Sequence, residues 1–208
     1  MNNTATKRFF VTAISTDSGK SLISAILVEA LKADYWKPVQ AGRPTDSDYM
    51  RDHVDPERII HPESYLLETP MSPHAAADID GVEIQLGNIV PPLTENHLII
   101  EGAGGLMVPL HDQVLISDLI KRLDVPVILV SNNYLGSINH TLLSISFLKT
   151  LGLPIEGIIF NGEPTPTTEN YILEYTGIKC IARIPKLDKV NRESIKQEAL
   201  KIDLKNLL

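Results

Sequence analysis

The sequence of 208 residues contains a single cysteine, Cys180, and no long run of apolar residues. One cysteine excludes an internal disulfide and any metal site built from several thiolates. Its apolar surroundings, in residues 179–182, are typical of a buried thiol. No apolar run approaches the ~20 residues of a transmembrane helix, and residues 1–8 do not lead into the apolar core of a signal peptide. We therefore expect a cytoplasmic protein that has no membrane partner.

Positive charge is scarce as well, since the formal net charge is -7. This balance argues against nonspecific binding to nucleic acid or to an anionic membrane. It does not argue against nucleotide binding, because phosphate sites depend on local backbone amides and one or two cations. Prolines and glycines are spread evenly, without a linker-like block or a repeat. Residues 1–208, which are 43% hydrophobic, are expected to form one globular domain with an ample core.

Short apolar segments alternate with helical patterns along the chain. Strands are predicted at Phe9–Thr12, Tyr35–Val39, Leu98–Glu101, Val127–Ser131, Gly157–Asn161 and Cys180–Ile184. Helices are predicted at Lys20–Leu31, Ile116–Leu123, Ile138–Leu151, Thr168–Tyr175 and Arg192–Leu200. Several of the strands lack polar alternation, as in a parallel sheet covered on both faces. The order predicts an α/β fold with a doubly wound, mainly parallel sheet and helices on both faces.

The segment from residue 43 to residue 92 is less regular. It contains acidic residues in polar surroundings, Asp46 and Asp48, and a helix start at Ser72-Pro73. A proline at the first helical position after a serine is an ordinary way to begin a helix. His74, which follows, therefore has a purely structural explanation as well as a functional one.

The most informative motif lies between Phe9 and Ser24. An apolar strand runs into a small polar turn, after which Gly19-Lys20-Ser21 opens a helix. This is the strand-turn-helix context of a P-loop, in which backbone amides and the lysine hold phosphate and the hydroxyl can bind Mg²⁺. The motif is incomplete, because Ile14 stands where the strict pattern has a glycine. A chance Gly-Lys-Ser is the alternative to a P-loop NTPase-like fold.

Other candidate residues lie at the ends of predicted strands, at the sheet edge where ligands bind in such folds. Lys37 could hold phosphate oxygens, although a lysine at a strand end is more often simply exposed. Glu101 begins the segment Glu-Gly-Ala-Gly-Gly, and a carboxylate there is suited to Mg²⁺, directly or through water. Its alternative role is an ordinary cap or ion pair. Asp48 is a second candidate metal ligand, although acids in polar loops are usually just solvated.

A glycine turn at Gly136 leads into a further helix, whose first amides could bind a carboxylate. The alternative is an ordinary helix capped by Ser137. The histidines show no spacing typical of a metal site, and the chain has no Gly-x-Ser-x-Gly nucleophile motif. The residues alone therefore indicate phosphate chemistry without a protein nucleophile.

These motifs together resemble the dethiobiotin synthetases, ATP-dependent enzymes that close the ureido ring in biotin synthesis. The resemblance covers nearly the whole chain. It is carried by the P-loop and by residues 36–42 (WKPVQAG), 71–75 (MSPHA), 100–105 (IEGAGG), 135–140 (LGSINH) and 160–162 (FNG). The combination of Lys-Pro-Val-x-x-Gly with Glu-Gly-Ala-Gly-Gly, in this order after a P-loop, is specific to that family.

The resemblance implies a reaction and its cofactors, ATP and Mg²⁺. In this family the diamine 7,8-diaminononanoate reacts with CO₂ to give a carbamate. The carbamate attacks the γ-phosphate to form a carbamic-phosphoric anhydride, and the second amine then closes the ring and expels phosphate. The resemblance also implies a homodimer with the substrate site at its interface, so that both subunits contribute to each site.

The resemblance assigns roles to individual residues. Lys20, Lys37 and Thr16 are implied as catalytic, and Ser21, Asp48 and Glu101 as ligands of Mg²⁺. Asn161 is implied to read the adenine, within a nucleotide site of Asp17, Ser18, Gly19, Lys20, Ser21, Leu22, Asp48, Glu101, Gly102, Ala103, Gly104, Asn161, Gly162, Pro185, Lys186 and Leu187. The substrate is implied to contact Ala41, and its carboxylate to bind Gly136, Ser137 and Asn139 of the second subunit.

Some residues depart from the family pattern and keep two alternatives open. Ala13, Ile14 and Ser15 replace the usual start of the loop, and Ala41 replaces a hydroxyl residue. A family member with weakened activity is therefore one alternative. The other is a nucleotide switch of the partitioning-ATPase type, although residues 13–18 lack the extra lysine of those proteins. Residues 195–208 mix apolar, basic and acidic side chains, which favours a packed terminal element over a membrane helix.

Overall fold

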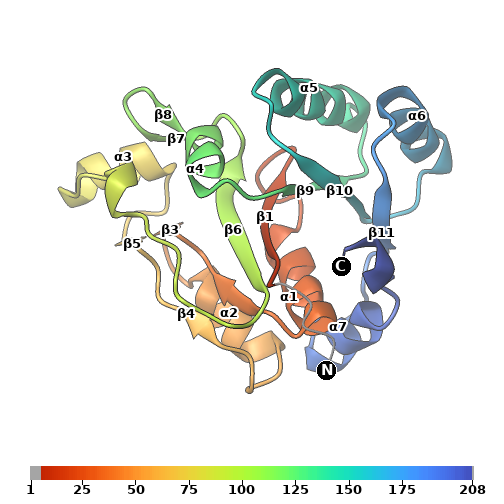
Figure 1. The fold of residues 1–208 in the computed structure, drawn as a ribbon, viewed down its shortest axis with the longest axis horizontal. Coiled ribbons are helices and arrows are strands. Elements are labelled where there is room, and N and C mark those ends of the chain that lie inside the picture. The colour runs from red at the N-terminus through yellow and green to blue at the C-terminus, as the bar shows by residue number, and fades with distance from the viewer. Residues whose placement is uncertain (1–5, 208) are drawn as a thin grey trace.

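The computed structural model describes residues 6–207 and is built on a central sheet of seven strands (Figure 1). The strand order is β11-β10-β9-β1-β6-β2-β4, and neighbouring strands are parallel. The strands are β1 (Arg8–Ala13), β2 (Asp34–Trp36), β4 (Ile60–His61), β6 (Leu98–Gly105), β9 (Val127–Asn132), β10 (Ile155–Asn161) and β11 (Cys180–Ile184). The chain enters the sheet at its centre and winds outward in both directions, which confirms the doubly wound topology.

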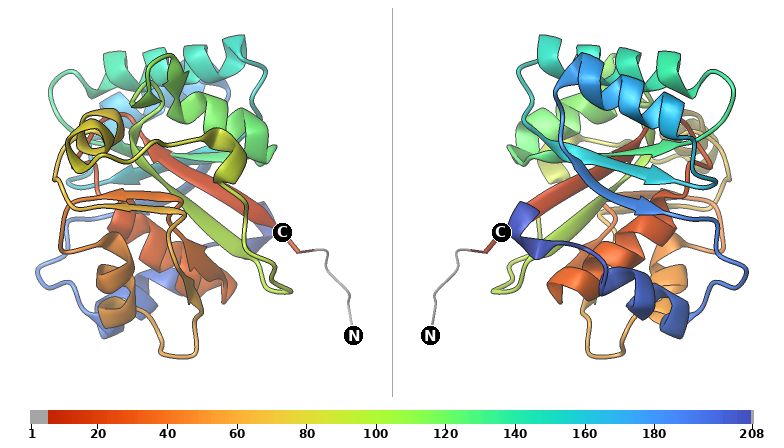
Figure 2. Two further views of the ribbon diagram at one scale, coloured as in Figure 1. Left: turned by 90° about the vertical axis from the view of Figure 1, so that its left-hand side faces the viewer. Right: turned by 90° about the vertical axis from the view of Figure 1, so that its right-hand side faces the viewer.

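Helices cover both faces of the sheet (Figure 2). One face carries α1 (Lys20–Leu31), α2 (Asp46–His53) and α7 (Arg192–Ala199), and the other carries α4 (Ile116–Leu123), α5 (Ser137–Thr150) and α6 (Pro166–Thr176). Alternate residues of β1 supply the two cores: Phe9 and Val11 pack with α1, whereas Phe10 packs on the opposite side with α4. Both faces are therefore apolar, which explains the lack of polar alternation in the strands.

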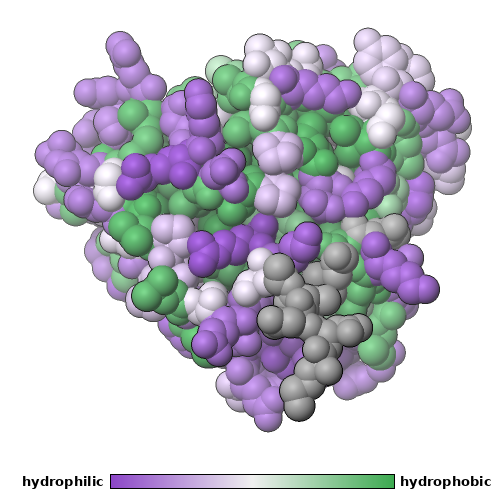
Figure 3. Space-filling view, viewed as in Figure 1, coloured by the Kyte–Doolittle hydropathy of each residue, from purple (hydrophilic) through white to green (hydrophobic). Residues whose placement is uncertain are grey.

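Shorter elements complete the fold beside β6. They are β3 (Val39–Ala41) paired with β5 (Tyr65–Leu67), α3 (Pro73–Asp80), η1 (Leu86–Asn88), and the antiparallel pair β7 (Pro109–His111) and β8 (Val114–Leu115). The short helix η2 (Leu204–Asn206) follows α7 in the C-terminal segment. The predicted helix start at Ser72-Pro73 is confirmed, because α3 begins at Pro73 after Ser72. On the face of Figure 1, apolar and polar side chains are interleaved (Figure 3).

The structure corrects the prediction of one strand over Tyr35–Val39. Strand β2 ends at Trp36, and β3 begins at Val39 in a separate small sheet. Pro38 lies between them and has no N–H to donate to a sheet ladder; its carbonyl instead accepts from the N–H groups of Ser64 and Tyr65. Lys37 therefore lies outside the strands, directly after the carboxyl end of β2 in the central sheet.

Helix α2 was not predicted from the sequence. Its eight residues are mostly polar, and only Ser47 and Met50 are buried. A helix with so little apolar surface gives almost no periodic signal. The missed helix proves important, because it carries an acidic residue of the candidate site.

The chain's C-terminal segment packs against the α1 face, as expected for a terminal element rather than a membrane helix. Ile195, Ile202 and Leu207 are buried in the cluster that surrounds α1. None of the helices in the described range is long and apolar enough to span a bilayer.

Cys180 is only partly buried, contrary to the expectation of a core thiol. It begins β11, which is the edge strand of the central sheet and has a neighbour on one side only. Burial raises the pKa of the Cys180 thiol above its ordinary value, and nearby Glu169 adds to this effect while Arg183 opposes it. The raised pKa lowers the fraction of Cys180 that is present as thiolate at neutral pH.

Candidate active site

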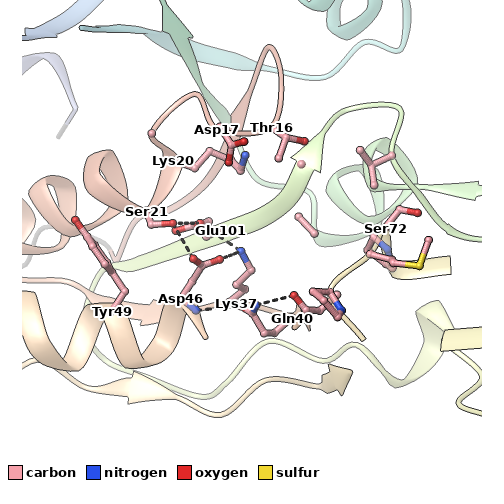
Figure 4. A pocket seen from close by; sticks show the side chains of 18 of the residues that line it. Thr16, Asp17, Lys20, Ser21, Lys37, Gln40, Asp46, Tyr49, Ser72 and Glu101 are labelled. Atoms are coloured by element: carbon pink, nitrogen blue, oxygen red, sulfur yellow. Dashed lines mark hydrogen bonds and ion pairs between the residues drawn. The ribbon is translucent and has the colours of Figure 1, made fainter. Parts of the chain in front are cut away.

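The carboxyl ends of β1, β2 and β6 open onto a cavity of about 710 Å³ (Figure 4). The predicted P-loop, Lys37 and Glu101 all lie at this edge of the sheet. Of the predicted site residues, the cavity is lined by Thr16, Asp17, Gly19, Lys20, Ser21, Leu22, Lys37, Ala41, Glu101, Ala103 and Gly104. Residues that are far apart in the sequence are thus gathered in one place.

The P-loop turn is held by its own polar side chains and by β10. Ser18 is buried, and its Oγ donates to the carbonyl of Ser15 over 2.9 Å. Gly19 has a left-handed φ of 85°, and a Cβ there would lie 2.2 Å from Nδ2 of Asn161. That same Nδ2 donates to the carbonyl of Ser18 at 2.9 Å. Only glycine fits this position, so the loop is fixed against the end of β10.

Helix α1 starts immediately after Gly19 and presents a site suited to an anion. Within the described chain, no side chain caps its start, and its first turn contains no acidic residue. The free N–H groups and the positive end of the helix dipole therefore face the cavity without a capping carboxylate from the helix itself. Lys20, in the first turn, is 8% exposed. Burial lowers the pKa of its ammonium, Glu101 opposes this lowering, and Lys37 reinforces it.

A polar cluster lies next to the P-loop and consists of the buried Lys37 and Glu101 and the partly buried Ser21 and Asp46 (Figure 4). The Lys37 ammonium pairs with Asp46 and lies 3.3 Å from Oε1 of Glu101. The Oγ of Ser21 lies 2.9 Å from Oδ1 of Asp46 and 3.0 Å from Oε1 of Glu101. From β2, the Tyr35 hydroxyl donates to Oε2 of Glu101 over 3.1 Å. Each charge therefore has a partner of opposite sign or a hydroxyl, as buried charges require.

The cluster keeps its charges despite burial. Burial alone would lower the pKa of Lys37, but Glu101 and Asp46 outweigh it and raise that pKa above its ordinary value. Burial works to raise the pKa of Asp46, but Lys37 and Ser21 overcome it and lower that pKa. Burial, followed by Glu101, holds the pKa of Tyr35 well above its usual range. At neutral pH the lysine is cationic, Asp46 is anionic, and Tyr35 is a neutral donor.

The expectation that Asp48 faces this site is wrong, and Asp46 takes its place. The Asp48 carboxylate is half exposed and accepts from Nη1 of Arg51 at 2.8 Å. It also accepts from the N–H of Thr45, whose Oγ1 caps the N–H of Asp48. Two residues along a helix differ in direction by about 200°, so Asp46 and Asp48 cannot face the same side. The signal was in the sequence: Thr45 followed three residues later by an acid resembles a capping box.

The oxygen ligands of the cluster fit Mg²⁺. This ion prefers hard oxygen donors and usually takes one or two protein carboxylates together with phosphate oxygens and waters. Ser21, Asp46 and Glu101 offer one hydroxyl and two carboxylates at this point. Nowhere in residues 6–207 do three His, Cys, Asp or Glu side chains group into a metal site by themselves. Phosphate oxygens and waters are the ligands that usually complete the shell of Mg²⁺ beside one or two protein carboxylates.

The remaining predicted residues lie outside the lining of this cavity. Gly102 faces the opposite side of β6, where a Cβ would lie 2.7 Å from the ring of Phe10. Asn161 and Gly162 follow β10, and the Gly162 N–H donates to the carbonyl of Ile184, next to Pro185, Lys186 and Leu187. Gly136, Ser137 and Asn139 stand at the start of α5. Within a single chain, these last residues do not join the cavity.

Sequence reasoning missed four polar residues that line the cavity, Gln40, Asp46, Tyr49 and Ser72. Asp46 was noted but not assigned to the site, because the helix that aims it was not recognised. Gln40 lies within the resemblance motif of residues 36–42, but nothing in the residue type indicates a role.

Comparison with known proteins gives consistent results along the chain. A family model described as an AAA domain matches residues 7–194. An ATP-dependent dethiobiotin synthetase BioD of Cytophaga hutchinsonii is 51% identical, over 94% of this chain and 97% of its own length. The proteins of the same name from Christiangramia forsetii and Paramagnetospirillum magneticum are 50% and 38% identical, with 94% and 89% of this chain covered and 95% and 91% of theirs.

Solved structures with a similar fold have much lower sequence identity. A ParA family ATPase from Chlorobium tepidum superposes with a TM-score of 0.54 at 17% identity, over 97% of this chain and 92% of that one. A plasmid partition protein from Borrelia burgdorferi gives 0.56 at 13% identity, over 97% and 99%. These likenesses support the P-loop NTPase-like fold and nothing beyond it.

Proposed function

Because this chain belongs to the ATP-dependent dethiobiotin synthetases and is thus an ATP-dependent ligase, we propose that it carboxylates 7,8-diaminononanoate with CO₂ and closes the ring to give dethiobiotin. The observation that carries the proposal is the convergence of Lys20, Lys37 and the oxygen cluster of Ser21, Asp46 and Glu101 on one cavity. Such a site supplies positioning and charge neutralisation, which phosphoryl transfer needs more than a nucleophile from the protein.

ATP binds with its phosphates at the start of α1. The free N–H groups of the helix start and the Lys20 ammonium contact the phosphate oxygens, and Thr16 contacts the transferred phosphoryl group. Ser21, Asp46 and Glu101 would hold Mg²⁺, which supplies neutralisation of phosphate charge. The lowered pKa of Lys20 supports this arrangement, since Glu101, Asp46 and Asp17 do not fully offset the burial of its ammonium and a phosphate at this position adds negative charge beside it.

Lys37 lies between the two reacting anions. The substrate carbamate attacks the γ-phosphorus while the bond to ADP breaks, and the second amine then attacks the carbamoyl carbon of the mixed anhydride and expels phosphate. Negative charge accumulates as the carbamate and the γ-phosphate approach each other, and a preorganised cation is worth most there. The raised pKa of Lys37 supports this role, because the side chain stays protonated although it is 4% exposed.

In this proposal the adenine binds at the ends of β10 and β11. The side chain of Asn161 is fixed there by its hydrogen bond to the P-loop carbonyl of Ser18. Its Oδ1 is suited to accept from the exocyclic amine of adenine, and residues 185–187 form the neighbouring wall. This position is on the same sheet edge as the phosphate site, which supports a single extended nucleotide site.

We also propose a homodimer in which α5 of one subunit completes the substrate site of the other. Gly136 has a left-handed φ of 107° at the start of α5, and the buried Oγ of Ser137 lacks a hydrogen-bond partner among the described residues. A helix start without a capping side chain among the described residues is suited to the substrate carboxylate. The exposed apolar side chains of Met107, Leu135 and Leu143 would be covered by the second copy. On the cavity side, Ala41 contacts the diamine.

The decisive assay is ADP release with and without the diamine and bicarbonate, with the product identified by mass spectrometry. We expect ADP only when both substrates are present, and dethiobiotin in equal amount. ADP release that ignores the diamine would favour the partitioning-ATPase type of switch, which has only the fold in its support. Slow but diamine-dependent product formation would indicate a weakened family member. The cytoplasmic location and the single domain over residues 1–208 stay predictions.

A further inference from the structure

Gln40 is a buried side chain whose role the proposed mechanism does not explain. It lies on β3 and lines the cavity beside Lys37 and Asp46 (Figure 4). The residue is 6% exposed, and a buried amide costs free energy unless its donors and acceptor are satisfied. Its hydrogen bonds all go to backbone atoms. Nε2 donates to the carbonyls of Ala41 at 3.1 Å and Gly42 at 3.2 Å, and Oε1 accepts from the N–H of Asp46 at 3.1 Å.

The bond from Asp46 to Gln40 adds to the capping of α2. Asp46 is the first residue of this helix, and the first N–H groups of a helix have no partner within it. Thr45 and Asp48 cap each other's N–H groups, and Gln40 accepts from the N–H of Asp46. One side chain thus spans the loop of residues 41–45 and fastens the start of α2 to β3.

The contacts of Gln40, Asp46 and Lys37 form a closed ring. The backbone leads from Lys37 to Gln40, the Gln40 amide holds the backbone of Asp46, and the Asp46 carboxylate returns to the Lys37 ammonium and to Ser21. The position of the Asp46 backbone therefore determines the direction in which its carboxylate points. Groups that orient a ligand in this way change metal affinity although they do not touch the metal.

We propose that Gln40 is a positioning residue that aims the Asp46 carboxylate at the metal ligand position, an inference that rests on the proposed Mg²⁺-dependent function. Without the amide, the loop of residues 41–45 loses its internal bonds and the first turn of α2 can shift. A displacement of about 1 Å is enough to weaken a preorganised site. Gln40 does not react and does not bind the metal; it acts through Asp46.

The test measures metal binding rather than turnover. Mn²⁺ replaces Mg²⁺ as the probe, in the presence of the β,γ-imido analogue of ATP, and free Mn²⁺ is followed by electron paramagnetic resonance. Gln40→Met keeps the length and removes the hydrogen bonds, and we expect it to raise the Mn²⁺ dissociation constant by about tenfold or more. The matched control is Gln197→Met on the exposed side of α7, whose amide donates to Glu193; it should leave the constant unchanged.

A double-mutant cycle separates positioning from a general structural role. If Gln40 acts through Asp46, Gln40→Met should change the Mn²⁺ dissociation constant by less than about threefold in an Asp46→Asn background. Equal losses in both backgrounds, or a Gln40→Met protein with normal Mn²⁺ affinity, would overturn the inference. Should Gln40→Met fail to fold, Gln40→Asn serves, since the shorter amide cannot span the loop. A wild-type protein that binds no Mn²⁺ with the analogue would instead contradict the proposed function itself.

Discussion

Lys37 is nearly buried, and yet it is charged, because two carboxylates raise its pKa against the effect of burial. Lys37→Gln retains much of the length and removes the charge. We expect turnover of the diamine to fall at least about a hundredfold, and ATP affinity to change less than about tenfold, because the charge acts mainly in the transition state. Calorimetry and product analysis on one preparation compare the two losses. Equal losses would make Lys37 a plain nucleotide contact.

Asp46 and Asp48 form a natural pair of test and control, two residues apart on one helix. Asp46→Asn removes a carboxylate from the cluster with Ser21 and Lys37, and an amide is a poorer ligand for Mg²⁺. We expect the Mg²⁺ concentration for half-maximal activity to rise about tenfold or more. Asp48→Asn, which changes only the capping side of α2, should leave that midpoint in place. The opposite result would restore Asp48 as the metal ligand.

At the scale of an element, the P-loop turn depends on close contact with β10. In Gly19→Ala the new Cβ meets Nδ2 of Asn161, and the residue must also keep a left-handed backbone. Gly81→Ala is the control, since Gly81 has a φ of 67° and open space around its Cβ position. Each should lose about 1 kcal/mol or more in free energy of unfolding from the backbone alone.

Only Gly19→Ala should also weaken ATP binding, by about a hundredfold, because the loop and Asn161 must move apart. Urea unfolding and nucleotide titration of both variants check this expectation. ATP affinity that stays normal in Gly19→Ala would show that the close contact with Asn161 is not needed for the nucleotide site.

At the scale of the whole molecule, the sequence predicts what depends on repeated apolar contacts. Six of the seven strands of the central sheet, and the helices that cover it apart from α2, were predicted because residues such as Val127 and Ile158 are buried in strands that have a helical layer on each face. Strand β4, which has only two residues, was not predicted. The P-loop, Lys37 and Glu101 followed from the rule that ligands lie at the carboxyl ends of such strands. Helix α2 and the break at Pro38 were not predicted. Short polar elements take their shape from hydrogen bonds such as that of Gln40, and these bonds leave no periodic pattern in the sequence.

The proposed dimer can be tested by mixing two inactive variants, because activity would recover only if each active site is built from two subunits. We expect Lys37→Gln to inactivate the cavity of its own subunit. Asn139 lies on the exposed start of α5, and we expect Asn139→Glu to repel the substrate carboxylate that is bound in the neighbouring subunit. Each homodimer then has two defective sites. A mixed dimer combines the intact cavity of one subunit with the intact α5 of the other, which leaves one complete site in two.

After random exchange, half of the dimers are mixed, so that activity should recover to about a quarter of the wild-type value. Activity of the equimolar mixture, followed over the time of subunit exchange, checks this expectation. The separate variants, incubated alone for the same time, are the control. If the mixture stays as inactive as its components while sedimentation shows mixed dimers, each site is built from one chain, and Asn139 does not act across an interface.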